Sequence, residues 1–227
     1  MPKIHDHLIQ VQKRLAEASR QSLRAPNSTQ LLAVSKTKPA ADVREAYVAG
    51  QRQFGENYLQ EALEKQQQLL DLDIEWHFIG PIQSNKTRLI AENFDWVHSV
   101  DRLKIAQRLN DQRPSGMAPI NICLQVNLDR EASKAGVSLA EVPALVESVS
   151  GLPHICVRGL MAIPAPRDKR AEQQQALQPL ADVLSHLQPQ YPQLDTLSMG
   201  MSKDLEAAIA AGSTMVRVGT DIFGARS

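Results

Sequence analysis

The sequence predicts an α/β protein, a single (β/α)8 barrel of the TIM type. Short apolar and β-branched runs recur along the 227-residue chain, and each is followed by a stretch with helical periodicity and helix end signals. Strands that alternate with helices pair in parallel, and eight such units can close into a barrel. No Gly- or Ser-rich linker divides residues 1–227, so we expect one domain. An open doubly wound sheet is the competing architecture, and it would usually use fewer strands.

Eight segments have the composition of buried strands. The expected strands are residues 31–35, 52–55, 76–79, 96–100, 120–127, 157–163, 196–199 and 214–218. An amphipathic segment over residues 4–23 precedes the first strand, and we expect it to pack outside the barrel as an extra helix.

Capping and stop signals mark several helices between these strands. The clearest are residues 42–49 with Gly50 as the stop, a helix capped by Asp101, a helix opened by the Ser138 and Glu141 capping box, and residues 205–211 capped by Ser202. The Gln-rich stretches 66–68 and 172–178 fit polar helix faces.

Composition excludes several classes of function. The 25 Lys and Arg residues balance 25 Asp and Glu residues and form no basic cluster, which argues against a nucleic-acid partner. His5, Asp6 and His7 occupy the place of a signal-peptide apolar region, and no apolar run approaches the roughly 20 residues of a membrane helix. We therefore expect a cytoplasmic protein without a membrane partner. Cys123 and Cys156 lie in apolar runs and are expected to be buried, with no metal-ligand spacing.

Lys36 directly follows the first expected strand, on the same side as Leu32 and Val34. If that side faces the barrel interior, the ammonium lies in the barrel mouth, where lost hydration would lower its pKa. Such an amine is suited to forming Schiff bases. The alternative is a strand-end lysine that reaches to solvent.

Two loops near the C-terminus have the composition of a phosphate site. Ser202 follows the seventh expected strand, and Gly219 and Thr220 follow the eighth. Barrels commonly bind phosphate with these two loops, through helix amides and hydroxyls, so the pattern fits a phosphorylated ligand. In the alternative reading, Ser202 is only a helix cap and Gly219 only a turn residue.

Arg217 should face the barrel interior together with Met215 and Gly219, because the flanking valines suit the helix side. A guanidinium there is unfavourable unless a carboxylate or a ligand accepts its hydrogen bonds. A buried ion pair and a ligand contact both remain open. His77 alone is a weak candidate, since a strand histidine is more often a core residue, whereas Asn57 could neighbour a ring or a phosphate.

Four segments together resemble the pyridoxal phosphate homeostasis protein family. They are AVSKTKP around Lys36, FGENYLQE around Asn57, WHFIGPIQSNK around His77, and LSMGMSKDLEAAIAAGSTMVRVGTDIFG near the C-terminus. These segments span almost the whole chain in order. The family is similar to the N-terminal barrel of the fold type III alanine racemases and ornithine decarboxylases, without their second β-domain.

The resemblance implies that pyridoxal 5'-phosphate (PLP) is the cofactor and that Lys36 forms the internal aldimine. It implies that Arg217 faces the pyridine nitrogen and that Ser202, Gly219 and Thr220 hold the phosphate. The expected cofactor-binding residues are Lys36, Asn57, His77, Met199, Ser202, Arg217, Gly219 and Thr220. The sequence departs from the family in lacking a glycine before Glu131, although it keeps Ser133, Lys134 and Gly136, and in ending at Ser227 without a short basic tail.

If Arg217 stays protonated against the ring nitrogen, that nitrogen must accept and remains unprotonated. An unprotonated pyridine is a weak electron sink, which disfavours transamination. The leading hypothesis is a non-enzymatic PLP carrier that buffers the cofactor for PLP-dependent apoenzymes, and we assign no catalytic residue. The alternatives are a weak amino-acid racemase, with Lys36 as one base and water or His77 as the other, and a Schiff-base aldolase. We expect a monomer, because the second domain builds the racemase dimer.

Overall fold

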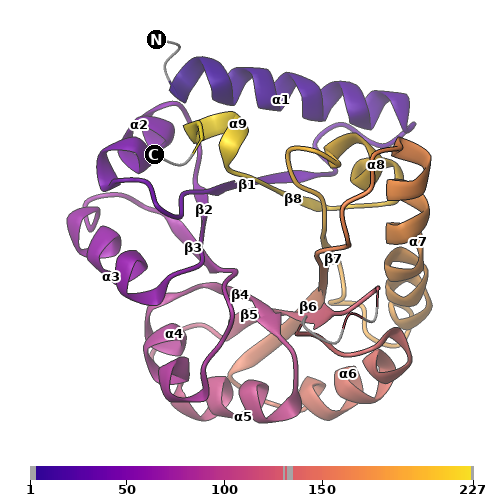
Figure 1. Cartoon of the computed structure of the whole chain (residues 1–227). Coiled ribbons are helices and arrows are strands. Elements are labelled where there is room, and N and C mark those ends of the chain that lie inside the picture. The colour runs from indigo at the N-terminus through magenta and orange to yellow at the C-terminus, as the bar shows by residue number, and fades with distance from the viewer. Residues whose placement is uncertain (1–3, 130, 132–134, 226–227) are drawn as a thin grey trace.

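The computed structural model describes residues 4–129, 131 and 135–225. Within them, eight parallel strands close into a barrel in the order β1 to β8, with helices around the outside (Figure 1). The strands are β1 (Gln30–Val34), β2 (Gln53–Glu56), β3 (Glu75–Phe78), β4 (Trp96–Val100), β5 (Ile120–Val126), β6 (Ile155–Ala162), β7 (Thr196–Ser198) and β8 (Met215–Val218). The predicted (β/α)8 barrel is confirmed, and each strand begins and ends within two residues of its expected bounds.

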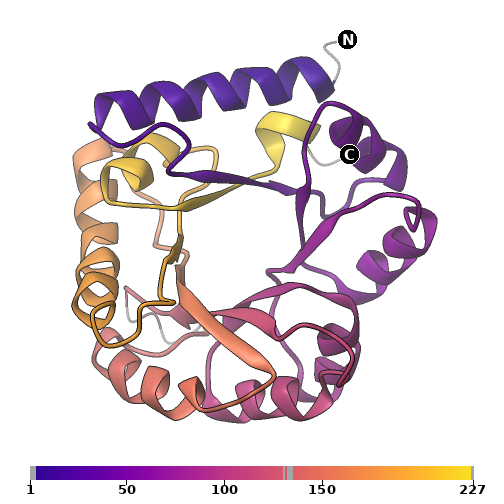
Figure 2. The same cartoon turned by 180° about the vertical axis from the view of Figure 1, so that it is seen from behind.

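Helices connect the strands on the outside of the barrel, as Figure 2 also shows from behind. They are α1 (Ile4–Gln21), α2 (Ala40–Val48), α3 (Leu59–Gln68), α4 (Thr87–Asn93), α5 (Leu103–Gln112), α6 (Val142–Ser150), α7 (Arg170–Leu187), α8 (Leu205–Ala210) and α9 (Thr220–Phe223), with short 3-10 turns η1 (Ser84–Lys86) and η2 (Leu139–Glu141). None of the described helices is long and apolar enough to cross a membrane.

Two of the expected helix caps are wrong. Arg102, not Asp101, stands at the N-cap of α5, and the Asp101 carboxylate pairs with the Arg102 guanidinium at 2.8 Å. The N-cap of α8 is Asp204, because a turn from Met201 to Asp204 comes before the helix. Ser202 therefore lies in the loop after β7. The Ser138 capping box is confirmed at η2, which leads into α6.

The strands alternate between a helix-facing side and a barrel-facing side, as β8 illustrates. Val216 and Val218 belong to the hydrophobic core between strands and helices, whereas Met215 and Arg217 line cavities inside the barrel. This alternation confirms the predicted inward direction of Arg217. Cys123 is fully buried as expected, but Cys156 is only half-buried.

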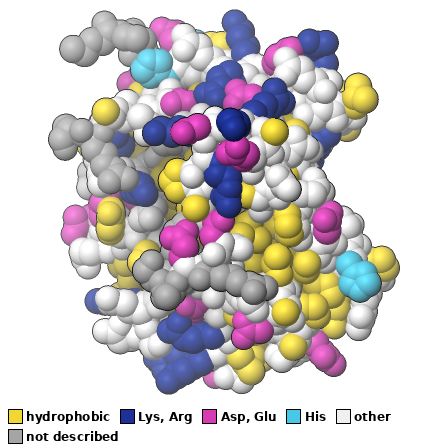
Figure 3. Space-filling view, turned by 45° about the vertical axis from the view of Figure 1, so that its right-hand side comes forward, with side chains coloured by type: hydrophobic (Ala, Val, Ile, Leu, Met, Phe, Trp, Pro, Cys, Tyr) yellow, Lys and Arg dark blue, Asp and Glu magenta, His cyan; other side chains and the backbone are white. Residues whose placement is uncertain are grey.

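The predicted extra helix α1 lies across the outside of the barrel beside α8 and α9 (Figure 1). Leu8, Val11, Leu15 and Ala18 form its buried stripe. On the face shown in Figure 3, basic and acidic side chains are interspersed, in keeping with the formal net charge of zero.

Candidate cofactor site

A cavity of about 400 Å³ opens at the C-terminal mouth of the barrel. Its lining residues are Val34, Lys36, Asn57, Ile79, Ile163, Met201, Ser202, Lys203, Arg217, Gly219, Thr220 and Asp221. Most of the candidate residues from the sequence therefore meet in one place, at the barrel end where TIM-type barrels place their functional groups.

Lys36 lies between two residues that the neighbouring strand and helix hold in place. The Ser35 hydroxyl donates to Glu56 Oε1 at 2.6 Å. The backbone amide of Thr37 donates to Glu61 Oε1 at 2.6 Å. Thr37 has φ 64°, a left-handed conformation that is unfavourable for a β-branched residue and is retained here by that contact. The backbone on either side of Lys36 is therefore fixed.

Lys65 completes this support from α3. Its ammonium donates to Glu56 Oε1 at 2.7 Å, to Glu61 Oε1 at 2.6 Å and to the carbonyl oxygen of Ser35 at 2.7 Å. Burial raises the pKa of Glu56, while Lys65 and Ser35 act in the opposite direction. Sequence reasoning missed this group, because Lys65 lies in a polar stretch of α3 whose only signal is the four-residue spacing from Glu61.

Arg217 is almost completely buried and donates to neutral oxygens. Its Nη1 reaches the Ser198 hydroxyl at 2.7 Å, and its Nη2 reaches the carbonyl oxygen of Ala162 at 3.0 Å. Among the described residues, no carboxylate lies within ion-pair distance of the guanidinium, so the buried ion pair considered from the sequence is absent there. Burial lowers the pKa of Arg217 to about 10, which leaves the side chain positively charged at neutral pH. The cavity thus contains a fixed cation.

The loops after β7 and β8 form one wall of the cavity, with Ser202 from the first and Gly219 and Thr220 from the second. A Cβ atom on Gly219 would lie only 3.0 Å from the carbonyl oxygen of Val34, so glycine permits the close approach of β8 to β1. Lys203, which sequence reasoning did not select, adds a third basic residue to the lining, beside Lys36 and Arg217.

Arg14 of α1 joins the loop after β7 to the two helices α8 and α9. Its Nη2 donates to the carbonyl oxygen of Ser202 at 3.0 Å, its Nη1 to Asp221 Oδ2 at 2.6 Å, and its Nε to Glu206 Oε1 at 2.9 Å. The added helix α1 therefore positions the predicted phosphate loops. Nothing in the sequence linked Arg14 to them, because the partners are about 190 to 207 positions away.

Asn57 lines the cavity with an unsatisfied polar atom. Its Oδ1 is buried and has no hydrogen-bond partner among the described residues. A buried amide oxygen without a partner is unfavourable by about 1–3 kcal/mol. Gly80 allows the two backbone segments to approach closely here, since a Cβ on Gly80 would lie 2.0 Å from the Asn57 carbonyl oxygen. The orphaned oxygen fits a cavity that receives a polar ligand.

The sequence comparisons agree on one family. A family model described as the N-terminal domain of alanine racemase matches residues 7–227. A pyridoxal phosphate homeostasis protein of Pseudomonas aeruginosa is 60% identical over 226 residues, which cover 100% of this chain and 97% of the relative. One from Escherichia coli is 53% identical over 229 residues, which cover 100% of this chain and 98% of that protein. The chain belongs to the pyridoxal phosphate homeostasis protein family.

Solved structures of similar proteins have the same fold. PipY of Synechococcus elongatus, solved with PLP bound, is 44% identical with a TM-score of 0.80, over 92% of this chain and 100% of PipY. Alanine racemase of Corynebacterium glutamicum is 17% identical with a TM-score of 0.72, over 97% of this chain and 62% of the racemase. The likeness to the racemase shows a shared barrel fold.

Two of the expected cofactor-binding residues do not line the cavity. His77 is fully buried within the barrel, where it contacts Glu75 and His98. Met199 belongs to the hydrophobic core, because the alternation of β7 turns Ser198 toward Arg217 and Met199 toward the helices. Lys134 of the family loop after β5 lies outside the described residues, as does Ser133.

Proposed function

We propose that this protein binds PLP in the cavity at the C-terminal mouth of the barrel, holds it as a Schiff base on Lys36, and buffers or supplies it for apoenzymes. One observation supports this most strongly. Lys36 and Arg217, at opposite ends of the sequence, line the same 400 Å³ cavity together with the two loops that barrels use for phosphate.

The residues present fit the chemistry of PLP. Arg217 offers a fixed cationic donor for the ring nitrogen. Ser202, Gly219 and Thr220 offer small or hydroxyl-bearing positions for the phosphate, and Lys203 offers a compensating charge. Asn57 Oδ1 needs a donor that the described protein residues do not supply. We assign the cofactor-binding role to these residues, and not to His77 or Met199.

The covalent step of this proposal needs only Lys36. Its neutral amine adds to the aldehyde carbon of PLP, and loss of one water leaves a carbon–nitrogen double bond, which water reverses on release. Arg217 keeps its proton and donates to the ring nitrogen, so that nitrogen remains a weak electron sink. A site of this kind favours holding the cofactor over transforming amino acids with it.

The racemase alternative needs a second base on the opposite side of the cofactor from Lys36. His77 is the candidate side chain, but it is fully buried in contact with Glu75 and His98 and does not line the cavity. No contact among the described residues favours the racemase over the carrier, so we propose the carrier.

Borohydride reduction of PLP-loaded protein tests the proposal, because it fixes a Schiff base to the lysine that forms it. We expect Lys36→Ala to abolish the reduced adduct, whereas Lys38→Ala, a matched change two residues away that is not part of the cavity lining, should keep it. Peptide mass mapping locates the adduct. An undiminished adduct in Lys36→Ala would refute the assignment. Transfer to an apoenzyme is measured separately, as the rate at which loaded protein restores its activity compared with free PLP.

A further inference from the structure

A chain of hydrogen bonds runs through the barrel interior from Glu75 to Arg217. Glu75 Oε1 lies 2.8 Å from His77 Nε2, and His77 Nδ1 lies 2.9 Å from His98 Nε2. His98 Nδ1 lies 2.7 Å from the Ser198 hydroxyl, which accepts from Arg217 at 2.7 Å. Four different strands, β3, β4, β7 and β8, contribute these residues.

The two ends determine the direction of every bond in the chain. The ionised Glu75 carboxylate can only accept, so a neutral His77 ring donates to it from Nε2 and accepts at Nδ1 from His98 Nε2–H. Arg217 can only donate to the Ser198 oxygen, and the Ser198 proton is left to donate to His98 Nδ1. His98 Nδ1 then accepts, which places the ring proton on Nε2, where it is donated to His77 Nδ1. His77 in turn carries its proton on Nε2 and donates it to the Glu75 carboxylate. Both histidines are neutral Nε2–H tautomers in this arrangement.

The surroundings of the two rings support this assignment. Both are completely buried, and burial lowers the pKa of each, although Glu75 and Asp95 act in the opposite direction on His77. Arg217 lowers the pKa of His98 further. The His77 ring stacks on the Trp96 indole, with centroids 5.4 Å apart and an interplanar angle of 6°, which restricts ring rotation.

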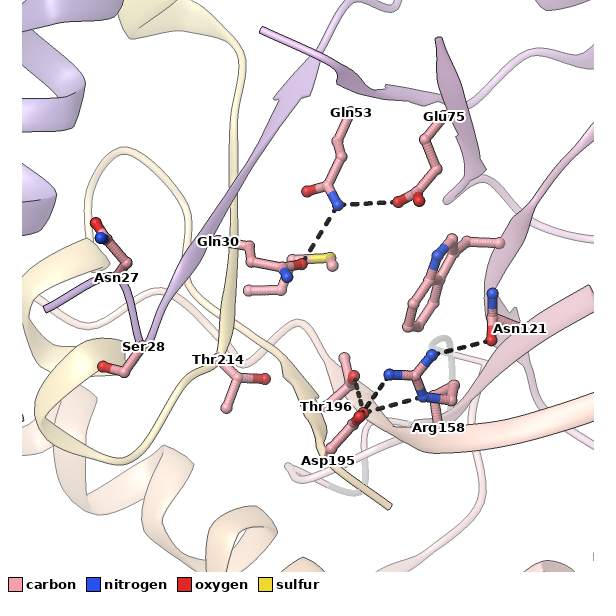
Figure 4. A pocket seen from close by; sticks show the side chains of 12 residues that line it. Asn27, Ser28, Gln30, Gln53, Glu75, Asn121, Arg158, Asp195, Thr196 and Thr214 are labelled. Carbon is pink, nitrogen blue, oxygen red and sulfur yellow. Dashed lines mark hydrogen bonds and ion pairs between the residues drawn. The ribbon is translucent and has the colours of Figure 1, made fainter. Parts of the chain in front are cut away.

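Glu75 connects the chain to the opposite mouth of the barrel. It lines a polar cavity of about 370 Å³ there, and its side chain is 40% exposed (Figure 4). Its other hydrogen-bond partner is Gln53, and the hydrogen bond from His77 lowers its pKa, so it is ionised at neutral pH. The nearby Arg158 pairs with Asp195, as the dashed lines in Figure 4 show.

We propose that Glu75, His77, His98 and Ser198 act as a relay of fixed polarity that orients and electrostatically supports Arg217 from the far mouth of the barrel. In this role the four are positioning residues for the cofactor. The link to the cofactor rests on the proposed function, in which Arg217 contacts the ring nitrogen, but the relay itself is a property of the protein alone.

The relay bears on how the positive charge of Arg217 is compensated inside the barrel. No described carboxylate lies within ion-pair distance of Arg217, and Asp204 acts on it only through a longer-range charge interaction, although a buried guanidinium needs compensating charge. The series of hydrogen bonds supplies indirect compensation for the Arg217 charge, because each hydrogen bond polarises the next and the series ends on the Glu75 carboxylate. Loss of that negative end would allow both histidines to reverse their tautomers. The Ser198 oxygen would then accept from both His98 and Arg217, and the Ser198 proton would lose its acceptor in the relay.

Nitrogen NMR of the full-length protein labelled with ¹⁵N-histidine tests the relay without cofactor. We expect Nε2–H tautomers for His77 and His98. The variants His77→Gln and His98→Gln assign the ring-nitrogen signals, because each variant removes the signals of one ring. Glu75→Gln should shift the ring-nitrogen signals of both histidines. Asp195→Asn is the matched control, because it removes a carboxylate from the same mouth outside the relay, and it should shift neither.

The absorbance spectrum of PLP-loaded protein tests the coupling to the cofactor. Glu75→Gln and Ser198→Ala should shift the absorbance maximum, and Asp195→Asn should not. An Nδ1–H tautomer on either histidine, or an unmoved His98 signal in Glu75→Gln, would overturn the relay. Equal absorbance shifts in Glu75→Gln and Asp195→Asn would indicate a general charge effect and overturn the coupling. Failure of the unchanged protein to bind PLP would instead refute the proposed function and leave the histidine result standing.

Discussion

Lys65 and Glu56 form a buried ion pair at 2.7 Å behind the strand that presents Lys36. Their side chains are 5% and 0% exposed, and the same ammonium binds the carbonyl oxygen of Ser35. The conformation of the Lys36 loop therefore depends on a charge pair that never contacts the cavity.

Replacing Lys65 with Met should strongly destabilise the protein, because it leaves the Glu56 carboxylate buried without its cation. We expect the free energy of unfolding to fall by about 3–5 kcal/mol, as measured by urea denaturation. The double variant Lys65→Met with Glu56→Gln should lose less than Lys65→Met alone, since no buried charge remains uncompensated. Equal or greater loss in the double variant would show that the pair acts only through packing.

Replacing Arg14 with Met should weaken binding of the phosphate group, because Arg14 joins the loop that carries Ser202 to Asp221 of α9, next to Thr220. We expect the Kd for PLP to rise about tenfold, which corresponds to about 1.4 kcal/mol. Binding of pyridoxal, which lacks the phosphate, should change little. Arg44→Met is the control, as it breaks a similar pair with Asp71 away from the cavity and should leave both affinities unchanged.

Acid should destabilise the protein through its two buried histidines. Burial lowers the pKa of His77 and His98 in the folded state, so as the pH falls below about 6.5 the unfolded chain takes up protons that the folded chain does not. The free energy of unfolding should fall by about 1.4 kcal/mol per pH unit for each histidine, down to the folded pKa values.

Urea denaturation between about pH 6.5 and pH 5 measures this slope, and His98→Gln should reduce it by about half. Unchanged stability across this interval would contradict the neutral state of the two rings. The charged groups that face them are Glu75 and Asp95 at His77, and Arg217 at His98.

Replacing Arg217 with Glu should change the chemistry of bound PLP, because a carboxylate favours protonation of the ring nitrogen. We expect a shifted absorbance maximum and slow transamination of added amino acids, detected as keto-acid formation. Arg217→Gln keeps a donor without the charge, so it should shift the absorbance without allowing transamination. Unchanged spectra and reactivity in both variants would show that Arg217 does not contact the ring.

The sequence by itself determined the barrel and much of the site. The alternation of Met215, Arg217 and Gly219 against two valines placed the guanidinium inside the barrel, because side chains on a strand alternate strictly between its two faces. The same rule put Lys36 on the side of Leu32 and Val34, but whether that side faces the barrel interior was left open by the sequence. Sequence segments such as AVSKTKP around Lys36 indicated the family, which the relatives confirm.

Tertiary structure alone decided which distant polar groups meet. Arg14 had no local signal, since its partners come from α8, α9 and the loop after β7. Lys65 had only its four-residue spacing from Glu61, since its other partners, Ser35 and Glu56, come from other elements. His77 and Met199 do not line the cavity, because a motif locates a residue near a site but does not fix its depth or its strand face. Closure of the barrel sets both, and it brings His77, His98, Ser198 and Arg217 into one line only when four strands pack around a common interior.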